Sequence, residues 1–318
     1  LGDVYKRQPP DDLRELITKS YATFRHEDVT PLRRVSEHEW CLELWHGPTF
    51  AFKDVALQLL GNLFEYFLAR RNATTSNASR ADRAPHTLTV LGATSGDTGS
   101  AAIAGLRSKE NIHIFILHPR GRVSPIQEAQ MTTVLDDNVH NLAVDGTFDD
   151  CQDIVKALFS DKAFNDQHHL GAINSINWAR ILSQIVYYFA AFFALRREQP
   201  QIDASSVQVV VPTGNFGDIL AGYYAKRLGV PMSKLVVATN ENDILQRFWA
   251  TGRYEKESAS GEVRATLSPA MDILVSSNFE RLLWYLAHES DTVADDKEEA
   301  AGQQVTQWMH ELKTRGSF

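Results

Sequence analysis

The chain has 318 residues, about twice the length that one hydrophobic core usually organises, so we expect two domains. Hydrophobic residues make up 43% and charged residues 23% of the sequence, a globular balance that excludes a wholly disordered or fibrous protein. The 32 basic and 40 acidic residues give a net charge of −8, so there is no basic field for nucleic acid or an anionic membrane, and we expect neither partner.

Local composition bears on the compartment and on the ends of the chain. The sequence has no run of about 18 uninterrupted apolar residues and no apolar signal-peptide segment at its start, so we expect a cytoplasmic protein. Cys41 and Cys151 are far apart and lack CxxC spacing, which predicts reduced, buried thiols and no metal site. Because the chain starts on Leu1 and stops at Phe318 directly after a helix-like run, we expect truncation at both ends.

Apolar residues at three- and four-residue spacings predict a first helix over about residues 55–71, and the polar stretch at 72–85 predicts a surface loop. Strands and helices then alternate, in the order strand 87–91, a helix beginning at 100–106, strand 112–117, helix 125–133, strand 139–144 and helix 148–159. This alternation predicts parallel pairing in an open α/β sheet.

A second series begins with a long, apolar helix predicted at about 178–196. It continues with strand 207–211, a turn that contains glycine, helix 219–228, strand 235–238 and a last helix at about 298–313. A strand–turn–helix unit with glycine in the turn therefore occurs twice, and the two turns are candidate ligand sites.

The first turn, LGATSGDTGSAA at residues 91–102, joins a strand to a helix N-terminus. Backbone N–H groups and the helix dipole attract an anion there, and glycines let a ligand approach the backbone. The turn lacks the lysine of the P-loop pattern GxxxxGK(S/T) and does not match GxGxxG, which disfavours nucleotide binding in those two modes. It predicts an anion site, and a turn of small residues selected for packing is the alternative.

The second turn, VVVPTGNFGDILAG at residues 209–222, has the same features: an apolar strand, glycines and then a helix. Carboxyl ends of strands in one sheet face a common crevice. Each turn alone is a weak indication of a site, but together they predict a ligand with two separated anionic groups.

A lysine provides the third candidate. Lys53 lies between Phe52 and Asp54 in the segment WHGPTFAFKDVALQLLG, where an apolar helix begins. Hydrophobic surroundings desolvate an amine and favour its neutral form, which is the form that reacts with a carbonyl group to give an imine. The alternative is a surface lysine next to an Asp54 that caps the helix.

The fourth candidate is NSINWAR at residues 174–180, at the start of the long apolar helix. Its polar side chains, those of Asn174, Ser175, Asn177 and Arg180, are suited to hydrogen-bonding a ligand. Capping of the helix explains the same residues equally well.

In this order, five segments resemble threonine synthases of the fungal type, which belong to the fold type II class of pyridoxal-phosphate enzymes. The segments are HGPTFAFKDVALQLLGNLFEYFL, GATSGDTGSAA, NSINWARI, PTGNFGDILAGYYAKRLG and MDILVSSNFERLL, and the resemblance covers about residues 30–290.

The resemblance implies roles for individual residues. Lys53 matches the lysine that the family joins to its pyridoxal 5'-phosphate cofactor. The residues implied around the cofactor phosphate are Gly214, Asn215, Phe216, Gly217 and Asp218. Those implied near the substrate carboxylate and the cofactor ring are Thr94, Ser95, Asp97 and Thr98, and a looser match places Asn174, Asn177 and Arg180 near the active-site pocket.

The resemblance also implies an architecture of two open, mostly parallel sheets flanked by helices, with the active site in the crevice between domains. The implied parts are an N-terminal remnant at 1–33, a large cofactor-binding domain at 34–84 and 172–318 that is incomplete at its C-terminus, and a small α/β domain at 85–171. The family places a hydroxyl residue opposite the pyridine nitrogen, from a region beyond the segment SSNFERLL, and we expect that residue to be missing here.

The implied activity is that of a carbon–oxygen lyase of threonine biosynthesis, which converts O-phospho-L-homoserine and water to L-threonine and phosphate. Lys53 would remove the α-proton and help to move the β-proton. The expected partner is this small molecule, and the chain is expected as a monomer or homodimer.

One alternative is a related serine or threonine dehydratase, disfavoured because such relatives carry SGN where this chain has Ser95, Gly96 and Asp97. Another is a non-catalytic fragment that binds the cofactor or a phosphorylated amino acid.

Overall fold

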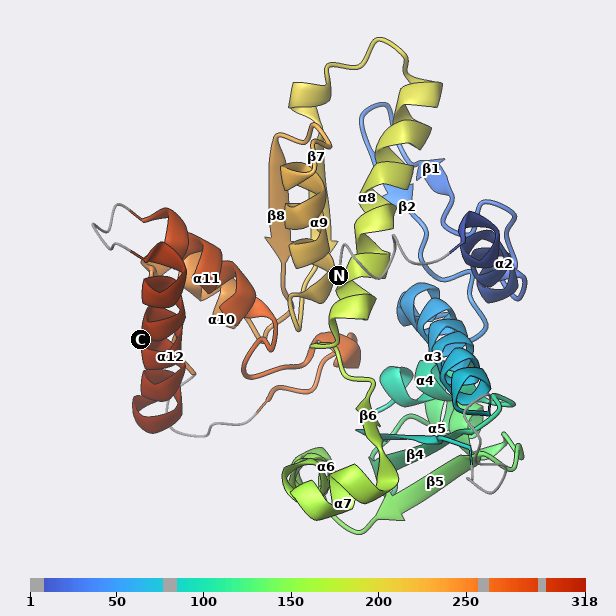
Figure 1. Cartoon of the computed structure of the whole chain (residues 1–318). Coiled ribbons are helices and arrows are strands. Elements are labelled where there is room, and N and C mark those ends of the chain that lie inside the picture. Colours follow the sequence, from blue (N-terminus) through green and yellow to red (C-terminus); the bar gives the residue numbers. More distant parts are fainter. Residues whose placement is uncertain (1–8, 77–84, 257–262, 291–295) are drawn as a thin grey trace. The chain divides into compact units, whose positions relative to one another are not determined.

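Figure 1 shows the structure, a computed structural model that describes residues 9–76, 85–256, 263–290 and 296–318. By spatial proximity the chain divides into two compact units, residues 1–183 and 184–318, and each is described by itself. The division falls inside α8 (Trp178–Glu198), so this helix continues from the first unit into the second.

The first unit opens with α2 (Pro10–Tyr21), whose first turn contains Asp11 and Asp12 at the positive end of the helix dipole. Two short strands follow, β1 (Leu32–Arg34) and β2 (Trp40–Leu42), which pair antiparallel. None of these three elements follows from the sequence periodicity, because three-residue strands are too short to show one and α2 is mostly polar.

A four-stranded sheet forms the centre of the first unit, in the order β5-β4-β3-β6, and all neighbouring strands are parallel. Its strands are β3 (Leu88–Ala93), β4 (Ile112–Pro119), β5 (Val139–Val144) and β6 (Leu170–Ala172). The helices between them are α4 (Asp97–Leu106), α5 (Pro125–Thr132), α6 (Phe148–Ser160) and α7 (Lys162–His168). The predicted parallel α/β sheet is confirmed.

Alternation of side chains along β4 places apolar groups on both faces of this sheet. Ile112, Ile114 and Ile116 belong to a buried core that includes side chains of α3 (Lys53–Ser76), α4 and α5. Leu117 belongs to a second core, together with Cys151 and Val155 of α6. Helices thus cover both faces, which is the usual situation of a parallel sheet.

The two cysteines are free thiols, and only one of them is buried as predicted. Cys151 is fully buried in the second of these cores. Cys41 is half-buried, which corrects the prediction of two buried thiols. The reason is its place in β2, one of only two strands in a small sheet.

α3 is longer than predicted. It begins at Lys53 and runs to Ser76, so residues 72–76 of the predicted loop are helical. Once a helix is formed, each added residue gains a backbone hydrogen bond, so a polar stretch is able to extend it. The rest of the predicted loop, residues 77–84, lies outside the described residues.

The second unit contains the parallel pair β7 (Gln208–Pro212) and β8 (Lys234–Ala238), connected through α9 (Gly217–Arg227). This strand–turn–helix unit is the second one predicted, and it is confirmed. The other helices that the structure describes after α8 are the 3-10 helix η1 (Ala204–Ser206), α10 (Ile244–Thr251), the 3-10 helix η2 (Pro269–Met271), α11 (Phe279–Glu289) and α12 (Lys297–Arg315).

An aromatic cluster holds the second unit together around Phe279, which is 1% exposed. Its ring lies 5.2 Å from that of Phe216 and 4.9 Å from those of Phe248 and Tyr254, between centroids. Tyr254 also exchanges two backbone hydrogen bonds of 3.1 Å with Phe318. Burial of large aromatic side chains is a major source of stability, and here it joins the turn before α9 to α10 and α11.

α8 is long and apolar enough, by length and composition alone, to cross a membrane. A helix in the core of a folded domain meets the same criterion. α8 buries Tyr187, Tyr188 and Leu195, and the Tyr188 hydroxyl donates to the backbone oxygen of Asp218 in α9 at 2.8 Å. We therefore interpret α8 as a helix that packs in the fold along one side, while Val186 and Phe193 are exposed.

α3 and α4 approach each other closely at two glycines. An added Cβ at Gly61 would overlap the carbonyl oxygen of Gly105, and one at Gly105 would lie 2.5 Å from the carbonyl oxygen of Leu57. Both obstacles are backbone atoms, which cannot turn aside as a side chain does. The contact therefore sets the distance between the two helices, whose first residues are Lys53 and Asp97.

We predict that Gly105→Ala lowers the free energy of unfolding by about 2 kcal/mol, because the helices must separate and loosen the core between them. Gly302→Ala is the matched control, since Gly302 lies in α12 and no atom of the residues that the structure describes is within 4 Å of its added Cβ. There the substitution should raise stability by about 0.5–1 kcal/mol. Urea unfolding followed by circular dichroism measures both effects, and equal effects would contradict the close approach of α3 and α4.

Candidate functional site

Lys53 is the centre of a polar contact between the first residues of two helices. It begins α3, and its side chain is 10% exposed. The Nζ atom donates to both carboxylate oxygens of Asp97 at 2.7 Å and to the hydroxyl of Thr98 at 2.8 Å. Asp97 and Thr98 open α4, so three of the residues singled out from the sequence lie together in the first unit.

The electrostatic surroundings of Lys53 act in opposite directions. Burial lowers the pKa of its amine, and the positive charge of Arg180 lowers that pKa further. The Asp97 carboxylate partly opposes this effect by charge and hydrogen bonding. The net result is a pKa below the ordinary lysine value, which favours the neutral, nucleophilic amine. The alternative of a surface lysine is therefore wrong.

The loop before Lys53 is held by Asp54, a fully buried carboxylate. It accepts hydrogen bonds from the backbone N–H of Thr49 at 2.8 Å and from the Thr49 hydroxyl at 2.7 Å. An added Cβ at Gly47 would overlap the Asp54 side chain, so the loop passes directly over the carboxylate. Asp54 thus binds the loop at the helix start and keeps the backbone of Lys53 in place.

The turn between β3 and α4 is organised by its own threonine. Thr94 is 2% exposed, and its hydroxyl accepts hydrogen bonds from the N–H groups of Gly96 at 3.0 Å and Gly99 at 2.9 Å. Gly96 has φ 154°, and an added Cβ there would overlap the Gln127 amide oxygen, so only glycine fits. Ser95 is exposed at the tip of the turn, while Thr94 is occupied within it.

The NSINWAR segment combines helix capping with a buried charge. The Asn177 side chain accepts from the N–H of Ala179 at 3.0 Å and donates to the carbonyl of Ala172 at 3.0 Å, which supports the capping interpretation. Arg180 is 2% exposed and donates to the carbonyl of Ile173 at 3.1 Å. Asn174 is exposed. Of this segment, Arg180 is the residue whose charge reaches Lys53.

In the second unit, the glycine turn between β7 and α9 has the form of an anion site. Phe216 has φ 63°, a left-handed conformation, and α9 begins at the next residue, Gly217. The residue in the left-handed conformation is thus Phe216, although glycine adopts this conformation more easily and Gly217 is the next residue. Its buried ring, packed on Phe279, stabilises the unusual backbone. The first N–H groups of α9 have no acceptor within the helix and are available to bind an anion.

Two residues just before α11, Ser276 and Asn278, hold this turn, and the sequence patterns gave them no role. Ser276 donates from its hydroxyl to the carbonyl of Gly214 at 2.7 Å. Asn278 donates to the carbonyl of Asn215 from its backbone at 3.1 Å and from its side chain at 2.9 Å. The signal that could have found them is the SSNF motif, which lies inside one of the five matched segments.

Asp218, in the first turn of α9, is an unusual carboxyl group. The Tyr188 hydroxyl donates to its Oδ1 atom at 3.0 Å. Burial raises the pKa of Asp218 to about 6, although the hydrogen bond from Tyr188 opposes the rise. Asp218 therefore has a proton affinity well above that of an exposed aspartate.

The amino-acid sequence of the chain is similar to those of known enzymes. A model of the pyridoxal-phosphate dependent enzyme family matches residues 23–316. The chain is 59% identical over 314 residues to threonine synthase of Saccharomyces cerevisiae, which covers 98% of this chain and 59% of that protein.

Solved structures agree with the sequence comparison. The crystal structure of threonine synthase from yeast has a TM-score of 0.87 and 58% identity, and the match covers 98% of this chain and 59% of that one. The structure of threonine synthase from Brucella melitensis with bound PLP has a TM-score of 0.83 and 47% identity, with 98% and 60% covered. The chain thus spans about three-fifths of the length of these relatives.

The raised pKa of Asp218 predicts a pH dependence of stability. Its folded-state pKa of about 6 lies above the ordinary value of 3.8, so the folded state binds the proton more tightly. The free energy of unfolding should therefore fall as pH rises from about 4 to about 6, by at most about 3 kcal/mol. Asp218→Asn removes this contribution, so the variant should gain stability relative to the wild type over that range.

Urea unfolding at several pH values measures the effect. Asp203→Asn is the control, because hydrogen bonds from Ser205 lower the pKa of that exposed carboxyl and give its contribution the opposite sign. A stability difference between Asp218→Asn and wild type that does not change with pH would show that Asp218 titrates normally.

Proposed function

The chain belongs to the family of pyridoxal-phosphate dependent enzymes, and from this premise we propose that it binds pyridoxal 5'-phosphate and converts O-phospho-L-homoserine and water to L-threonine and phosphate. The observation that carries the proposal is the buried Lys53 amine, held at 2.7 and 2.8 Å by Asp97 and Thr98. The high identity to threonine synthases over almost the whole chain supports the choice of reaction.

The residues present fit the cofactor. Pyridoxal phosphate has an aldehyde, which needs a neutral amine, and a phosphate, which needs backbone donors. Lys53 offers an amine with a lowered pKa. At Gly217 an added Cβ would lie 3.7 Å from the Asn278 side-chain nitrogen, an ordinary contact, so the packing of the described residues does not require glycine there. Space for a ligand at the start of α9 explains that glycine.

We assign the cofactor contacts accordingly. Lys53 carries the cofactor, and the turn of Gly214, Asn215, Phe216, Gly217 and Asp218 binds its phosphate. When bound, the cofactor supplies an electron sink that stabilises negative charge on the substrate carbon next to the amine. The Lys53 amine then holds and moves protons at Nζ, a role for which its lowered pKa is suited.

We assign the substrate contacts to the first unit. Ser95 and Thr98 bind the substrate carboxylate with the N–H groups at the start of α4, and Thr94 keeps that turn in shape. Asp97 positions the Lys53 amine. Arg180, with Asn174 and Asn177 beside it, completes the positive surroundings of an anionic substrate.

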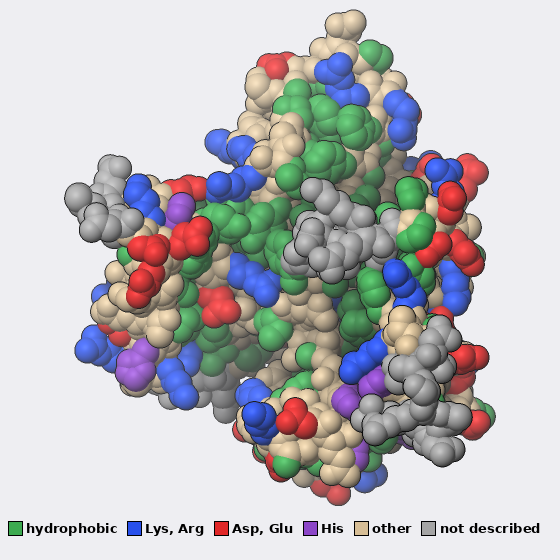
Figure 2. All heavy atoms as spheres, viewed as in Figure 1, with side chains coloured by type: hydrophobic (Ala, Val, Ile, Leu, Met, Phe, Trp, Pro, Cys, Tyr) green, Lys and Arg blue, Asp and Glu red, His purple; other side chains and the backbone are tan. Residues whose placement is uncertain are grey.

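We further propose that the protein is cytoplasmic and that it is a monomer or homodimer. It would act on this small molecule and bind neither nucleic acid nor a membrane. The net charge of −8 supports this, as do the acidic and basic side chains, which are interspersed on the described surface shown in Figure 2. For the domains we propose an N-terminal segment at residues 1–33, a large cofactor-binding domain formed by residues 34–84 and 172–318, and a small α/β domain at residues 85–171.

The reaction is tested by incubating the protein and pyridoxal phosphate with O-phospho-L-homoserine, and separately with L-serine or L-threonine. Equal amounts of phosphate and L-threonine are expected from the first substrate. A keto acid from L-serine or L-threonine would favour a dehydratase instead. Cofactor binding without any product would favour a non-catalytic binding protein.

We predict that Lys53→Ala abolishes covalent attachment of the cofactor, because the ε-amine of this lysine is buried and lies at the starts of α3 and α4. Pyridoxal phosphate is added, reduced with borohydride, and located by mass spectrometry of peptides. Lys109→Gln is the control, since Lys109 is half-buried and burial lowers the pKa of its amine, as it does for Lys53. Attachment that persists in Lys53→Ala would refute the assignment.

We predict that Gly217→Val raises the dissociation constant of pyridoxal phosphate about tenfold or more, because the branched side chain would occupy the space of the phosphate. Stability should change little, since an added Cβ meets no close neighbour. Equilibrium dialysis measures binding, and Gly302→Val in α12 controls for the effect of valine at a helical glycine. An unchanged dissociation constant in Gly217→Val would contradict the phosphate site.

A further inference from the structure

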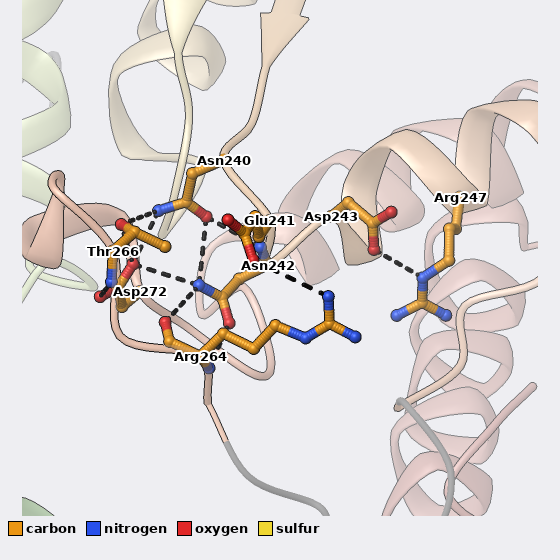
Figure 3. Close-up of polar contacts among 8 residues, drawn as sticks. All are labelled: Asn240, Glu241, Asn242, Asp243, Arg247, Arg264, Thr266 and Asp272. Atoms are coloured by element: carbon orange, nitrogen blue, oxygen red, sulfur yellow. Dashed lines mark hydrogen bonds and ion pairs between the residues drawn. The ribbon is translucent and has the colours of Figure 1, made fainter.

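A single carboxylate in the second unit accepts four hydrogen bonds (Figure 3). The Oδ1 atom of Asp272 accepts from the side-chain nitrogen of Asn240 at 2.7 Å, from that of Asn242 at 3.1 Å and from the hydroxyl of Thr266 at 2.7 Å. The Oδ2 atom accepts from the backbone N–H of Thr266 at 2.9 Å. Four donors aimed at one carboxylate form a strong, directional contact.

These partners come from two separate segments. Asn240 and Asn242 follow the end of β8, while Thr266 and Asp272 belong to the stretch that leads to α11. The Asn242 side chain also pairs with the backbone of Arg264, donating to its carbonyl at 2.9 Å and accepting from its N–H at 2.9 Å. Residues 264–272 are therefore bound along their length to the chain beyond β8.

Residues 264–272 pack against the glycine turn before α9. Met271, directly before Asp272, is so close that an added Cβ at Gly214 would lie 3.1 Å from its Cα atom and 3.2 Å from its sulfur. Four residues after Asp272, Ser276 donates to the carbonyl of Gly214 at 2.7 Å. Asp272 thus lies between Met271 and Ser276, the two residues that contact this turn, and its hydrogen bonds hold the segment that contains them.

We propose that Asp272 is a positioning residue for the phosphate-binding turn. By holding residues 264–272 to the end of β8, it keeps Met271 and Ser276 against Gly214 and so sets the backbone that receives the cofactor phosphate. The inference rests on the proposed function, because it assigns the turn its phosphate. The hydrogen bonds of the Asp272 carboxylate go to Asn240, Asn242 and Thr266, which lie outside the turn, and by this proposal Asp272 does not bind the ligand.

The chemistry of the contact indicates the substitution to make. Asp272→Asn keeps the size of the side chain but replaces one acceptor oxygen with an NH₂ group. That group would face a donor whichever way the amide turned, because both oxygens accept hydrogen bonds. The segment should therefore loosen, and the turn with it, while the aromatic cluster around Phe279 still holds the second unit together.

The test compares pyridoxal phosphate with pyridoxal, which lacks the phosphate, by equilibrium dialysis. Asp272→Asn should raise the dissociation constant of pyridoxal phosphate about tenfold and that of pyridoxal less than about twofold. A general loss of stability would weaken both ligands alike. Asp243→Asn is the matched control, since Asp243 is a nearby carboxylate that accepts from Arg247 at 2.8 Å outside this network (Figure 3), and it should change neither constant.

Thr266→Val is the second variant, to be used even if Asp272→Asn does not fold. It removes one donor to Asp272 and should weaken the binding of pyridoxal phosphate, but not of pyridoxal, in the same direction and by a smaller factor. If the wild type binds pyridoxal phosphate and the variants keep its ratio of the two constants, the inference is overturned alone. If the wild type does not bind pyridoxal phosphate, the proposed function fails and the inference with it.

Discussion

The hydrogen-bonded contact between Lys53 and Asp97 is the interaction around which the candidate site of the first unit is arranged. Burial alone would lower the pKa of the amine, and the carboxylate at 2.7 Å partly opposes this effect. The two groups are 44 residues apart in sequence and meet because α3 and α4 approach through Gly61 and Gly105. A backbone contact in the core thus determines the geometry of a buried amine at the starts of two helices.

The two glycine turns are held in shape by different kinds of hydrogen bond. Both join a parallel strand to a helix N-terminus, and both have the form of an anion site, in which the turn must keep its N–H groups in place. In the first unit, Thr94 holds the turn from within, through its own hydroxyl. In the second unit, Ser276 and Asn278 hold the turn from a distant part of the chain. The second turn therefore depends on the folding of residues far from it, and we propose Asp272 as one of the residues that position it.

Several features of the candidate site could be read from residue types and spacing. A lysine between aromatic and acidic residues at a helix start, and glycines after apolar strands, have local physical meanings. The left-handed residue of the second turn could not be found in this way. It is Phe216 and not a neighbouring glycine, because its ring is buried against Phe279 and stabilises the strained backbone. Such a compensation depends on a residue 63 positions further along.

The sequence by itself determined the parallel α/β series, because side-chain alternation along β4 and the apolar face of α3 are local patterns that each segment carries. The tertiary structure alone decided the three-residue strands β1, β2 and β6, which exist only through their partners, and the half-burial of Cys41. It also decided which donors surround Lys53 and Asp272. Hydrogen-bond partners from distant segments leave no periodic signal in a sequence, since only folding brings them within reach.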